Sequence, residues 1–352
     1  MWKDKKVLVT GGASFIGSHL VDSLLKKGAI IEVVDDFSSG KLQNLEYGRG
    51  LKKGESNHWT AENLSIWKED LKKKSSVKSI MEDTEIVFHL AALHGGRGYI
   101  SSHPADCCTN MILDQLVFEE ARKADVERVC FASSACVYPR YLQEQEGSTY
   151  LLKEEDCNPF VRDKAFADLE YGWAKLMGEM ALRAYHKQYG MKTSSVRIFT
   201  AYGPRENETH AIIALIAKAF IRTDPYIIWG TGGQDRNFTY VQDIVDAMML
   251  AAEKIEDGTP VNAGRQDRIT IKQAAELVFD IIGWQPKTIE YDLSKPQGPV
   301  SRAANLRRAT EILGWAPKVS YREGFQKTIE WYFANKNREE IKANLDNLLI
   351  ER

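Results

Sequence analysis

The sequence predicts an α/β fold in which a doubly wound parallel β-sheet is joined to a smaller C-terminal domain. Short, nearly continuous apolar runs are the first observation, since they are typical of strands buried on both faces of a parallel sheet. They lie at residues 6–10, 29–34, 85–90, 127–132 and 194–199. Helical patterns between the runs, as over 16–27 and 106–124, are the second observation, because strands that alternate with helices form parallel sheets.

After the sequence YGP the alternation becomes looser, which divides the chain into unequal parts. We expect a first domain over residues 1–200, to which a later strand and helix return near 230–255. A second, partly discontinuous domain is expected over 201–335. Residues 336–352 are highly charged with a helical pattern, so they are expected to form an amphipathic helix that packs on the body or on a partner subunit. Further helices are expected near 209–222 and 241–254.

Composition and charge argue against several functional classes. The chain has 352 residues, 43% hydrophobic and 27% charged, as is typical of a soluble globular protein. A net charge of -2 and a pI near 6.4 argue against nucleic-acid binding. The five cysteines form no CxxC pair, which argues against a disulfide framework and a structural zinc site, and we expect no metal. Neither a signal-peptide core nor a membrane-length apolar run is present, so we expect a cytoplasmic protein without membrane contact.

A glycine turn joins the first predicted strand to the first helix in the stretch VLVTGGASFIGSHL. Gly11 suits a tight turn, and Gly17 lets the helix approach the strand closely. The first helical N–H groups, those of Phe15 and Ile16, would then face a pyrophosphate. Ser14 takes the middle position, where its hydroxyl can hydrogen-bond phosphate or cap the helix. The spacing alone also fits a structural turn that holds no ligand.

Acidic residues at the ends of the next two predicted strands favour a dinucleotide. A carboxylate at Asp35 would accept hydrogen bonds from both ribose hydroxyls of an adenosine and repel a 2′-phosphate, which favours NAD over NADP. Asp36 is expected to be a turn residue. Asp70 and Leu71 follow the next short strand and would lie beneath the adenine, although a helix N-cap explains Asp70 equally well.

Three further residues suggest hydride chemistry. Ser134 follows a predicted strand, and the segment YGWAK places Tyr171 and Lys175 four residues apart on one helix face. A lysine ammonium and a positively charged nicotinamide would lower the pKa of Tyr171, so that its phenolate acts as a base on a sugar hydroxyl, while Ser134 orients that hydroxyl. In isolation, a Tyr/Lys pair is better explained as an exposed helix face.

Together these motifs resemble those of the extended short-chain dehydrogenase/reductase family, from about residue 5 to about residue 335. The motifs are TGGASFIGSHL, Asp35, HLAA, SSACVYP, YGWAK, YGP and RNFTYVQD. The resemblance implies an NAD-dependent epimerase or dehydratase of nucleotide sugars, with a Rossmann domain and a C-terminal domain for the nucleotide diphosphate sugar. It also implies that Leu90, Ala91 and Ala92 contact the cofactor, and that the protein is a homodimer built on a four-helix bundle that includes the Tyr/Lys helix.

The residues after Ser134 bear on the reaction. Dehydratases of the family resemble TDEVYG here, whereas this chain has Ala135 and Cys136, so dehydration is not expected. SSACVYP and the stretch AALHGGRGYISSH resemble the GDP-mannose 3,5-epimerase subfamily, in which a cysteine at this position is an acid/base on the sugar carbons. Gly95, Gly96 and Arg97 would then lie close to the substrate. The implied cycle oxidises C4, exchanges a proton at C3 or C5 through Cys136, and returns the hydride.

One departure from that subfamily leaves the reaction open. The loop after YGP is short, RENETH, and lacks the lysine that serves the subfamily as second acid/base. His210 can in principle substitute, although a lone histidine at a helix start is more often a cap or a surface residue. A single C3 or C5 epimerisation, a 4-epimerase or C4 oxidoreductase that uses only the Ser/Tyr/Lys triad, and an inactive NAD sensor therefore remain alternatives.

Three polar residues of the C-terminal region match substrate-binding positions of the family. Arg236 and Asn237 of RNFTYVQD and Arg302 of PVSRAAN match positions that bind the diphosphate or the nucleotide. Arginine suits phosphate oxygens because its guanidinium is planar and always charged. Without the resemblance, surface salt bridges would be the better explanation of both arginines. Asn110 is expected either to orient the substrate or to cap a turn.

Overall fold

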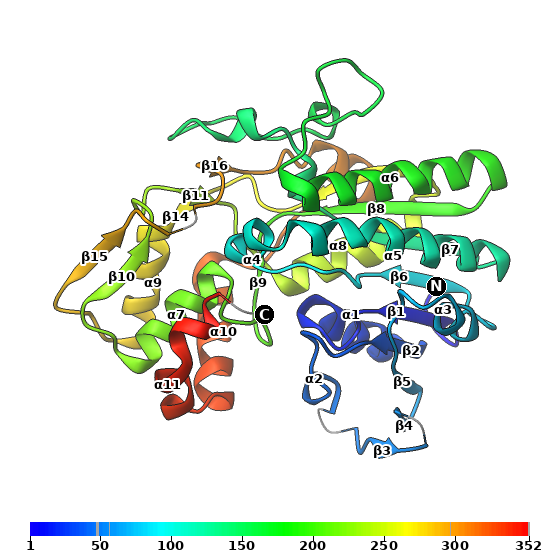
Figure 1. Ribbon diagram of the computed structural model, residues 1–352, viewed down its shortest axis with the longest axis horizontal. Coiled ribbons are helices and arrows are strands. Elements are labelled where there is room, and N and C mark those ends of the chain that lie inside the picture. The colour runs from blue at the N-terminus through cyan, green and yellow to red at the C-terminus, as the bar shows by residue number, and fades with distance from the viewer. Residues whose placement is uncertain (47–48, 56, 296, 351–352) are drawn as a thin grey trace.

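The computed structural model describes residues 1–46, 49–55, 57–295 and 297–350, and within them a nine-stranded sheet forms the centre of the molecule (Figure 1). The strands are β1 Lys6–Thr10, β2 Ile30–Asp35, β3 Lys52–Lys53, β4 His58–Ala61, β5 Leu64–Lys68, β6 Ile86–His89, β7 Arg128–Ser134, β8 Lys192–Ile198, β9 Ala201–Tyr202, β10 Tyr226–Trp229, β11 Asp235–Arg236, β12 Thr239–Tyr240, β13 Asp257–Ala263, β14 Ile269–Thr270, β15 Ile289–Asp292 and β16 Ser301–Arg302. The order in the large sheet is β13-β8-β7-β6-β1-β2-β5-β4-β3, parallel from β13 to β5, with antiparallel β4 and β3 at the edge.

Helices cover both faces of this sheet, as the sequence predicts. The helices are α1 Phe15–Lys26, α2 Gln43–Glu46, α3 Lys74–Ile80, α4 Arg97–Ser102, α5 Pro104–Lys123, α6 Leu169–Tyr189, α7 Ala211–Ile221, α8 Val241–Lys254, α9 Ile271–Ile282, α10 Tyr321–Asn335 and α11 Arg338–Leu348. Along β1, Val7 and Val9 pack with α1 and α8, whereas Leu8 between them packs with α3, α5 and α6. Alternate side chains of one strand thus belong to opposite cores, which confirms the doubly wound α/β fold.

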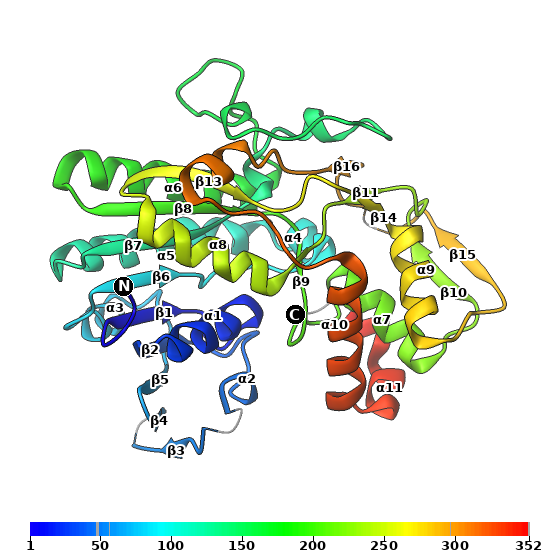
Figure 2. The same ribbon diagram turned by 180° about the vertical axis from the view of Figure 1, so that it is seen from behind.

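A second hydrophobic core lies beside the sheet and is built from the later part of the chain (Figure 2). It contains side chains of α7, α9, α10 and α11, and β10 pairs with β15 at its edge. After the second core begins, the chain returns to the large sheet through α8 and β13. Helix α8 lies within the predicted stretch 230–255, whereas strand β13 lies after it.

The charged C-terminal segment forms a helix that packs on its own chain. The Asn337 side chain caps α11 by accepting hydrogen bonds from the backbone N–H groups of Glu339 and Glu340. Ile341 is buried in the second core, where α11 packs against α7. Of the two predicted locations, the body of the protein is therefore the one observed, and residues 351–352 lie outside the described residues.

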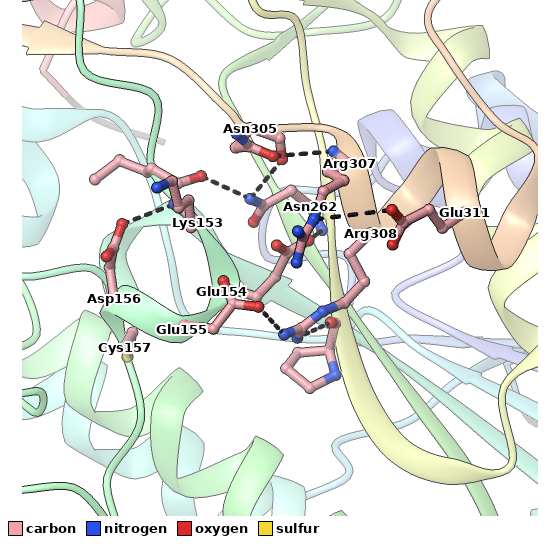
Figure 3. Close-up of polar contacts among 12 residues, drawn as sticks. Lys153, Glu154, Glu155, Asp156, Cys157, Asn262, Asn305, Arg307, Arg308 and Glu311 are labelled. Carbon is pink, nitrogen blue, oxygen red and sulfur yellow. Dashed lines mark hydrogen bonds and ion pairs between the residues drawn. The ribbon is translucent and has the colours of Figure 1, made fainter.

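Hydrogen bonds from one edge-strand residue join two distant segments to the sheet (Figure 3). The backbone N–H of Asn262 on β13 donates to the Glu154 carboxylate (2.9 Å), which belongs to the 3₁₀ turn Glu154–Asp156 after β7. The Asn262 side-chain amide donates to the carbonyl oxygens of Leu152 (2.9 Å) and Asn305 (3.1 Å). The loop between β7 and α6 and the segment after β16 are thereby held next to each other; the loop contains Cys136, and β16 ends at Arg302, both of which line the site described below.

Candidate active site

A cavity of about 1260 Å³ lies at the carboxyl ends of β1, β2, β6 and β7, where ligands bind in open α/β sheets. Most of the predicted site residues line it. They are Gly11, Ser14, Phe15, Ile16, Asp35, Asp70, Leu71, Leu90, Ala91, Ala92, Gly95, Ser134, Cys136, Tyr171, Lys175 and Arg302. Five predicted residues are absent from the described lining. They are Gly17, Gly96, Arg97, Arg236 and Asn237.

The last two helices, α10 and α11, supply part of the cavity wall. Trp331 and Lys336 at the end of α10, and Asn344 on α11, line the cavity together with Lys41 of the loop after β2. Burial lowers the pKa of Lys41, and the positive charge of Lys336 lowers it further. The cavity therefore extends from the first strands of the chain to its C-terminal helices.

The glycine turn after β1 has the close contacts that its sequence predicts. Gly11 has a φ of +68°, and a Cβ there would lie 2.9 Å from the backbone nitrogen of Ala91. A Cβ on Gly17 would lie 2.2 Å from the Gly11 carbonyl oxygen, so α1 could not approach the strand. The Ser14 hydroxyl donates a hydrogen bond to the Gly11 carbonyl oxygen (2.5 Å) and does not cap α1. The N-terminus of α1, at Phe15, remains directed at the cavity.

Asp35 is held rigidly at the end of β2. Its carboxylate accepts hydrogen bonds from the backbone N–H groups of Ala13 (3.0 Å) and Phe37 (2.9 Å). A Cβ at Gly40 would lie 2.7 Å from this carboxylate, a requirement for glycine that the sequence analysis missed. Asp36 accepts from the backbone N–H two residues on, as expected of a turn residue. The glycine turn and Asp35 together fit the pyrophosphate and adenosine ribose of a dinucleotide.

Asp70 and Leu71 follow β5 and line the cavity next to Asp35. Asp70 also accepts a hydrogen bond from the backbone N–H of Lys72 (2.9 Å). Of the two explanations that the sequence left open for Asp70, the helix N-cap is wrong, because the N-cap of α3 is Lys73. The place beneath the adenine stays a prediction.

Ser134, Tyr171 and Lys175 meet at the end of β7 and the start of α6, where Tyr171 and Lys175 are almost completely buried. Burial raises the pKa of Tyr171 well above its usual value, and the nearby Cys136 and Asp114 raise it further, whereas Ser134 lowers it. The sequence predicts that Lys175 lowers the pKa of Tyr171. In the structure, burial has the largest effect on this pKa and raises it. A positively charged nicotinamide is the remaining expected source of phenolate at neutral pH.

A buried polar chain lies behind Lys175 that the sequence analysis did not predict. The two ring nitrogens of His89 contact the Thr10 hydroxyl (2.7 Å) and one carboxylate oxygen of Asp114 (2.9 Å). The other oxygen of Asp114 has no hydrogen-bond partner among the described residues. Burial lowers the pKa of Lys175, and the charge of Asp114 opposes this change. Asp114 therefore helps to keep the buried ammonium charged.

Cys136 lies in the 3₁₀ turn Ala135–Val137, directly after Ser134, and is fixed by a residue that the sequence analysis missed. The backbone N–H of Asp168 donates to the Cys136 carbonyl oxygen (2.8 Å). The buried Asp168 carboxylate contacts Arg97 (2.9 Å) and Arg302 (3.5 Å), and a guanidinium nitrogen of Arg302 lies 3.8 Å from the Cys136 sulfur. An acidic residue just before the YGWAK helix is the only sequence signal that pointed to Asp168.

Arg236 lies beside Arg302 because β11 and β16 pair in parallel at these two residues. Burial, together with the positive charges of Arg302 and Arg97, lowers the pKa of Arg236 to about 9. Three neighbouring guanidinium groups favour an anion beside them. Asn237 has a different role: it is fully buried, and its amide donates to the Arg265 carbonyl oxygen (2.7 Å), which points to a structural function instead of substrate contact.

The side chain of Asn110 holds the glycine-rich loop after β6 in place. The Asn110 side chain accepts from the Leu93 N–H (2.7 Å) and donates to the Leu93 carbonyl oxygen (3.0 Å), so of its two expected roles the structural one is observed. A Cβ at Gly96 would lie 2.2 Å from the Thr209 carbonyl oxygen. Gly96 is therefore required where two loops cross, while Gly95 borders the cavity.

Two histidines and a glutamate, which the sequence analysis did not combine, form a row that begins with His94 beside Tyr171. The His94 ring centroid is 5.6 Å from that of Tyr171 and 5.6 Å from that of His210. His210 is the N-cap residue of α7 but makes no side-chain cap bond, and its Nδ1 lies 3.5 Å from the Glu206 carboxylate. Burial lowers the pKa of His210 to about 4 and raises that of Glu206 well above its usual value. All four residues line the cavity.

The part of the chain that the structure describes lacks a metal-binding cluster and a membrane-spanning helix. No three His, Cys, Asp or Glu side chains in it are grouped so that they could hold a metal ion. None of its helices has both the length and the apolar character needed to cross a membrane. All five cysteines are free thiols.

The fold and the cavity define a class of protein: an enzyme of the Rossmann type that binds a dinucleotide at the carboxyl edge of a parallel sheet. The chain belongs to the NAD dependent epimerase/dehydratase family, whose sequence model matches residues 7–264. Its cofactor is NAD, and its family comprises enzymes of the extended short-chain dehydrogenase/reductase type that act on nucleotide sugars.

Individual relatives differ in the reaction for which they are named. A putative UDP-glucose 4-epimerase of Methanocaldococcus jannaschii is 29% identical over 94% of this chain and 99% of its own length. A GDP-mannose 3,5-epimerase of Arabidopsis thaliana is 29% identical over 96% of this chain and 85% of its own length. The crystal structure of a UDP-glucose 4-epimerase with UDP-glucose from Thermotoga maritima is 28% identical, has a TM-score of 0.77, and covers 93% of this chain and 98% of that one.

Proposed function

We propose that this protein is an NAD-dependent nucleotide-sugar epimerase that acts through a transient 4-keto sugar and inverts C3, C5 or both. The observation that carries the proposal is the position of Cys136. Its thiol borders the same cavity as Ser134, Tyr171 and Lys175, and the Arg302 guanidinium lies 3.8 Å from its sulfur, where it would stabilise a thiolate.

The residues would divide the reaction between them as follows. When bound, NAD supplies the acceptor for the C4 hydride and a positive charge near Tyr171. Tyr171 takes the proton of the C4 hydroxyl, and Ser134 orients that hydroxyl. The ketone at C4 acidifies the hydrogens on C3 and C5, and Cys136 exchanges a proton there. Return of the hydride completes a cycle without net redox change.

A nucleotide diphosphate sugar fits the charge of the site. Arg236 and Arg302 lie side by side; Arg302 is buried and contacts Asp168, whereas Arg236 is partly buried. A diphosphate would supply the missing negative charge, and a guanidinium binds phosphate oxygens through two parallel hydrogen bonds. We propose that these two arginines bind the diphosphate.

We favour a GDP-hexose or a related GDP-sugar as the substrate. The relative from Arabidopsis thaliana is named as a GDP-mannose epimerase and aligns over nearly the whole chain. The relatives named as UDP-glucose 4-epimerases support the alternative, a 4-epimerase or C4 oxidoreductase that uses only Ser134, Tyr171 and Lys175. Dehydration is disfavoured because Ala135 and Cys136 cannot replace an acidic pair.

The experiment that tests the function offers the protein GDP-, UDP-, CDP- and dTDP-sugars in D2O and follows each sugar by NMR. We expect deuterium at C3 or C5 of a GDP-sugar. Inversion at C4 without uptake of deuterium would instead establish the alternative function.

Replacement of the cysteine tests its role separately. In a Cys136→Ala variant we expect transient reduction of bound NAD to persist, because Tyr171 is intact, and deuterium uptake to be lost. Cys108→Ala is the matched control, since Cys108 is a free cysteine that does not belong to the described cavity lining. Unchanged deuterium uptake in Cys136→Ala would reduce the role of this cysteine to packing.

We further propose a homodimer in which α5 and α6 meet the same helices of a second copy. Large apolar side chains are exposed on these neighbouring helices, with Ile112 of α5 60% exposed and Trp173 and Met177 of α6 41% and 43% exposed. The spacing of Trp173 and Met177 places them on one helix face. The free cysteines support a reducing compartment such as the cytoplasm.

A further inference from the structure

Inversion of a carbon requires a proton to leave from one face of the sugar and another to arrive at the opposite face. If the proposed function holds, on which this inference rests, Cys136 serves one face only. Tyr171 and Lys175 are engaged at the C4 hydroxyl. Of the other groups that line the cavity around Tyr171, two carry a proton readily near neutral pH in their unperturbed form, and they are His94 and His210.

His94 packs against Tyr171 at the border of the cavity. Its ring centroid lies 5.6 Å from that of Tyr171, and its side chain is exposed although the residue borders the cavity. The loop that carries it is rigid, because Asn110 makes two hydrogen bonds to the backbone of the preceding residue, Leu93. His94 therefore combines a fixed backbone with an accessible imidazole.

His210 and Glu206 lie behind His94 and complete a polar row. The His210 ring is 5.6 Å from the His94 ring, and the Glu206 carboxylate lies 3.5 Å from His210. The second carboxylate oxygen of Glu206 is buried without a hydrogen-bond partner among the described residues. Since burial opposes charge on both groups, His210 is a neutral imidazole that packs beside His94.

We propose that His94 is the second acid/base group of the epimerisation and acts opposite Cys136, and that His210 and Glu206 are positioning residues that hold its ring. The C–H bond next to the C4 ketone breaks, its electron pair stays on the sugar as an enolate, and its proton passes to the Cys136 thiolate beside Arg302. The protonated ring of His94 then gives a proton to the other face and becomes a neutral imidazole. Water carries a proton from the Cys136 thiol to that imidazole, which restores the starting state.

A His94→Gln variant tests this assignment, because glutamine keeps polarity and approximate length but transfers no proton. We expect transient NADH formation to persist and inversion at C3 or C5 to fall about 10²–10⁴-fold, the usual contribution of a general acid/base. Deuterium uptake through Cys136 without inversion should remain. His186→Gln on α6 is the control, since His186 is not among the described lining residues. A His210→Gln variant should lower kcat for inversion while KM and NADH formation stay unchanged.

Three outcomes would overturn the assignment, and they are distinguishable. Inversion at the wild-type rate in His94→Gln, together with loss of exchange in Cys136→Ala, would exclude His94 and leave the proposed function intact. Loss of NADH formation in His94→Gln would place His94 in the oxidation step instead. Absence of C3 and C5 exchange by the wild-type protein with every nucleotide sugar would reject both the proposed function and this role of His94. A thermal melt of each variant verifies that it is folded.

Discussion

At the scale of a residue, the burial of Tyr171 opposes its proposed role as a base, because burial raises the pKa of its phenol. The site buries its phenol beside Cys136, and both burial and this neighbour raise the pKa of Tyr171. A buried phenol is a poor base, so its activation depends on positive charge nearby. The ammonium of Lys175 is itself destabilised by burial and supported by Asp114, so the expected source of that charge is the bound nicotinamide.

Tyr171→Phe should abolish the first step of the reaction. Without the hydroxyl no base accepts the C4 proton, so NADH formation on addition of substrate should fall by about 10²–10⁴-fold. Absorbance at the NADH band measures this directly. Tyr185→Phe on the same helix serves as the control, since the Tyr185 hydroxyl contacts Glu119 and is not part of the described cavity lining. Persistent NADH formation in Tyr171→Phe would remove Tyr171 from this role.

Residues with local signals could be predicted from the sequence, and residues with only long-range partners could not. Gly11 and Asp35 belong to a strand–turn–helix pattern, so their place at the cavity follows from spacing alone. Asp168 and His94 acquire their surroundings from segments far away in the sequence, Arg302 for the first and His210 for the second. Such contacts leave no periodic trace in a single sequence.

At the scale of elements, a buried ion pair holds α6 to β8. The Arg197 guanidinium contacts the Glu179 carboxylate at 2.8 and 2.9 Å, and it also donates to the carbonyl oxygens of Glu154 (3.0 Å) and Cys157 (3.2 Å). Ser133 of β7 adds a hydrogen bond to Glu179 (2.5 Å). One side chain thus connects the Tyr171 helix, the central sheet and the loop that follows Cys136.

Arg197→Met should destabilise the protein strongly. It leaves the Glu179 carboxylate buried without its partner, which costs about 3–5 kcal/mol of the free energy of unfolding. Chemical denaturation measures the change, and an Arg197→Met/Glu179→Leu double variant should recover part of it because no unpaired charge remains. A loss below about 1 kcal/mol in the single variant would contradict the importance of this pair.

The elements of the first half and the helices near 209–222 and 241–254, which are α7 and α8, could be predicted closely, whereas the strands of the second half that follow β8 could not. The pattern over 106–124 corresponds to α5 at Pro104–Lys123, and the run 6–10 is β1 itself. Strand β13, by contrast, contains Gly258 and Pro260 and begins with a register shift, so it has no continuous apolar run. It belongs to the sheet because β8 offers an open edge, which is a property of the assembled sheet.

At the scale of the whole molecule, the exposed apolar residues of α5 and α6 form the proposed interface of a homodimer. Trp173→Glu should convert the proposed dimer to a monomer, because a carboxylate buried at the interface would lack a partner. Sedimentation velocity measures the state. Phe333→Glu, which changes an equally exposed apolar residue on α10, should leave the dimer intact. A monomeric wild-type protein, or a Trp173→Glu variant that stays dimeric, would contradict this interface.

The wall of the cavity that α10 and α11 supply has a consequence for the order in which the protein matures. The glycine turn and Asp35 are synthesised before Trp331, Lys336 and Asn344. A chain that stops before α10 would therefore lack this wall, and we expect its cavity to be more open to solvent.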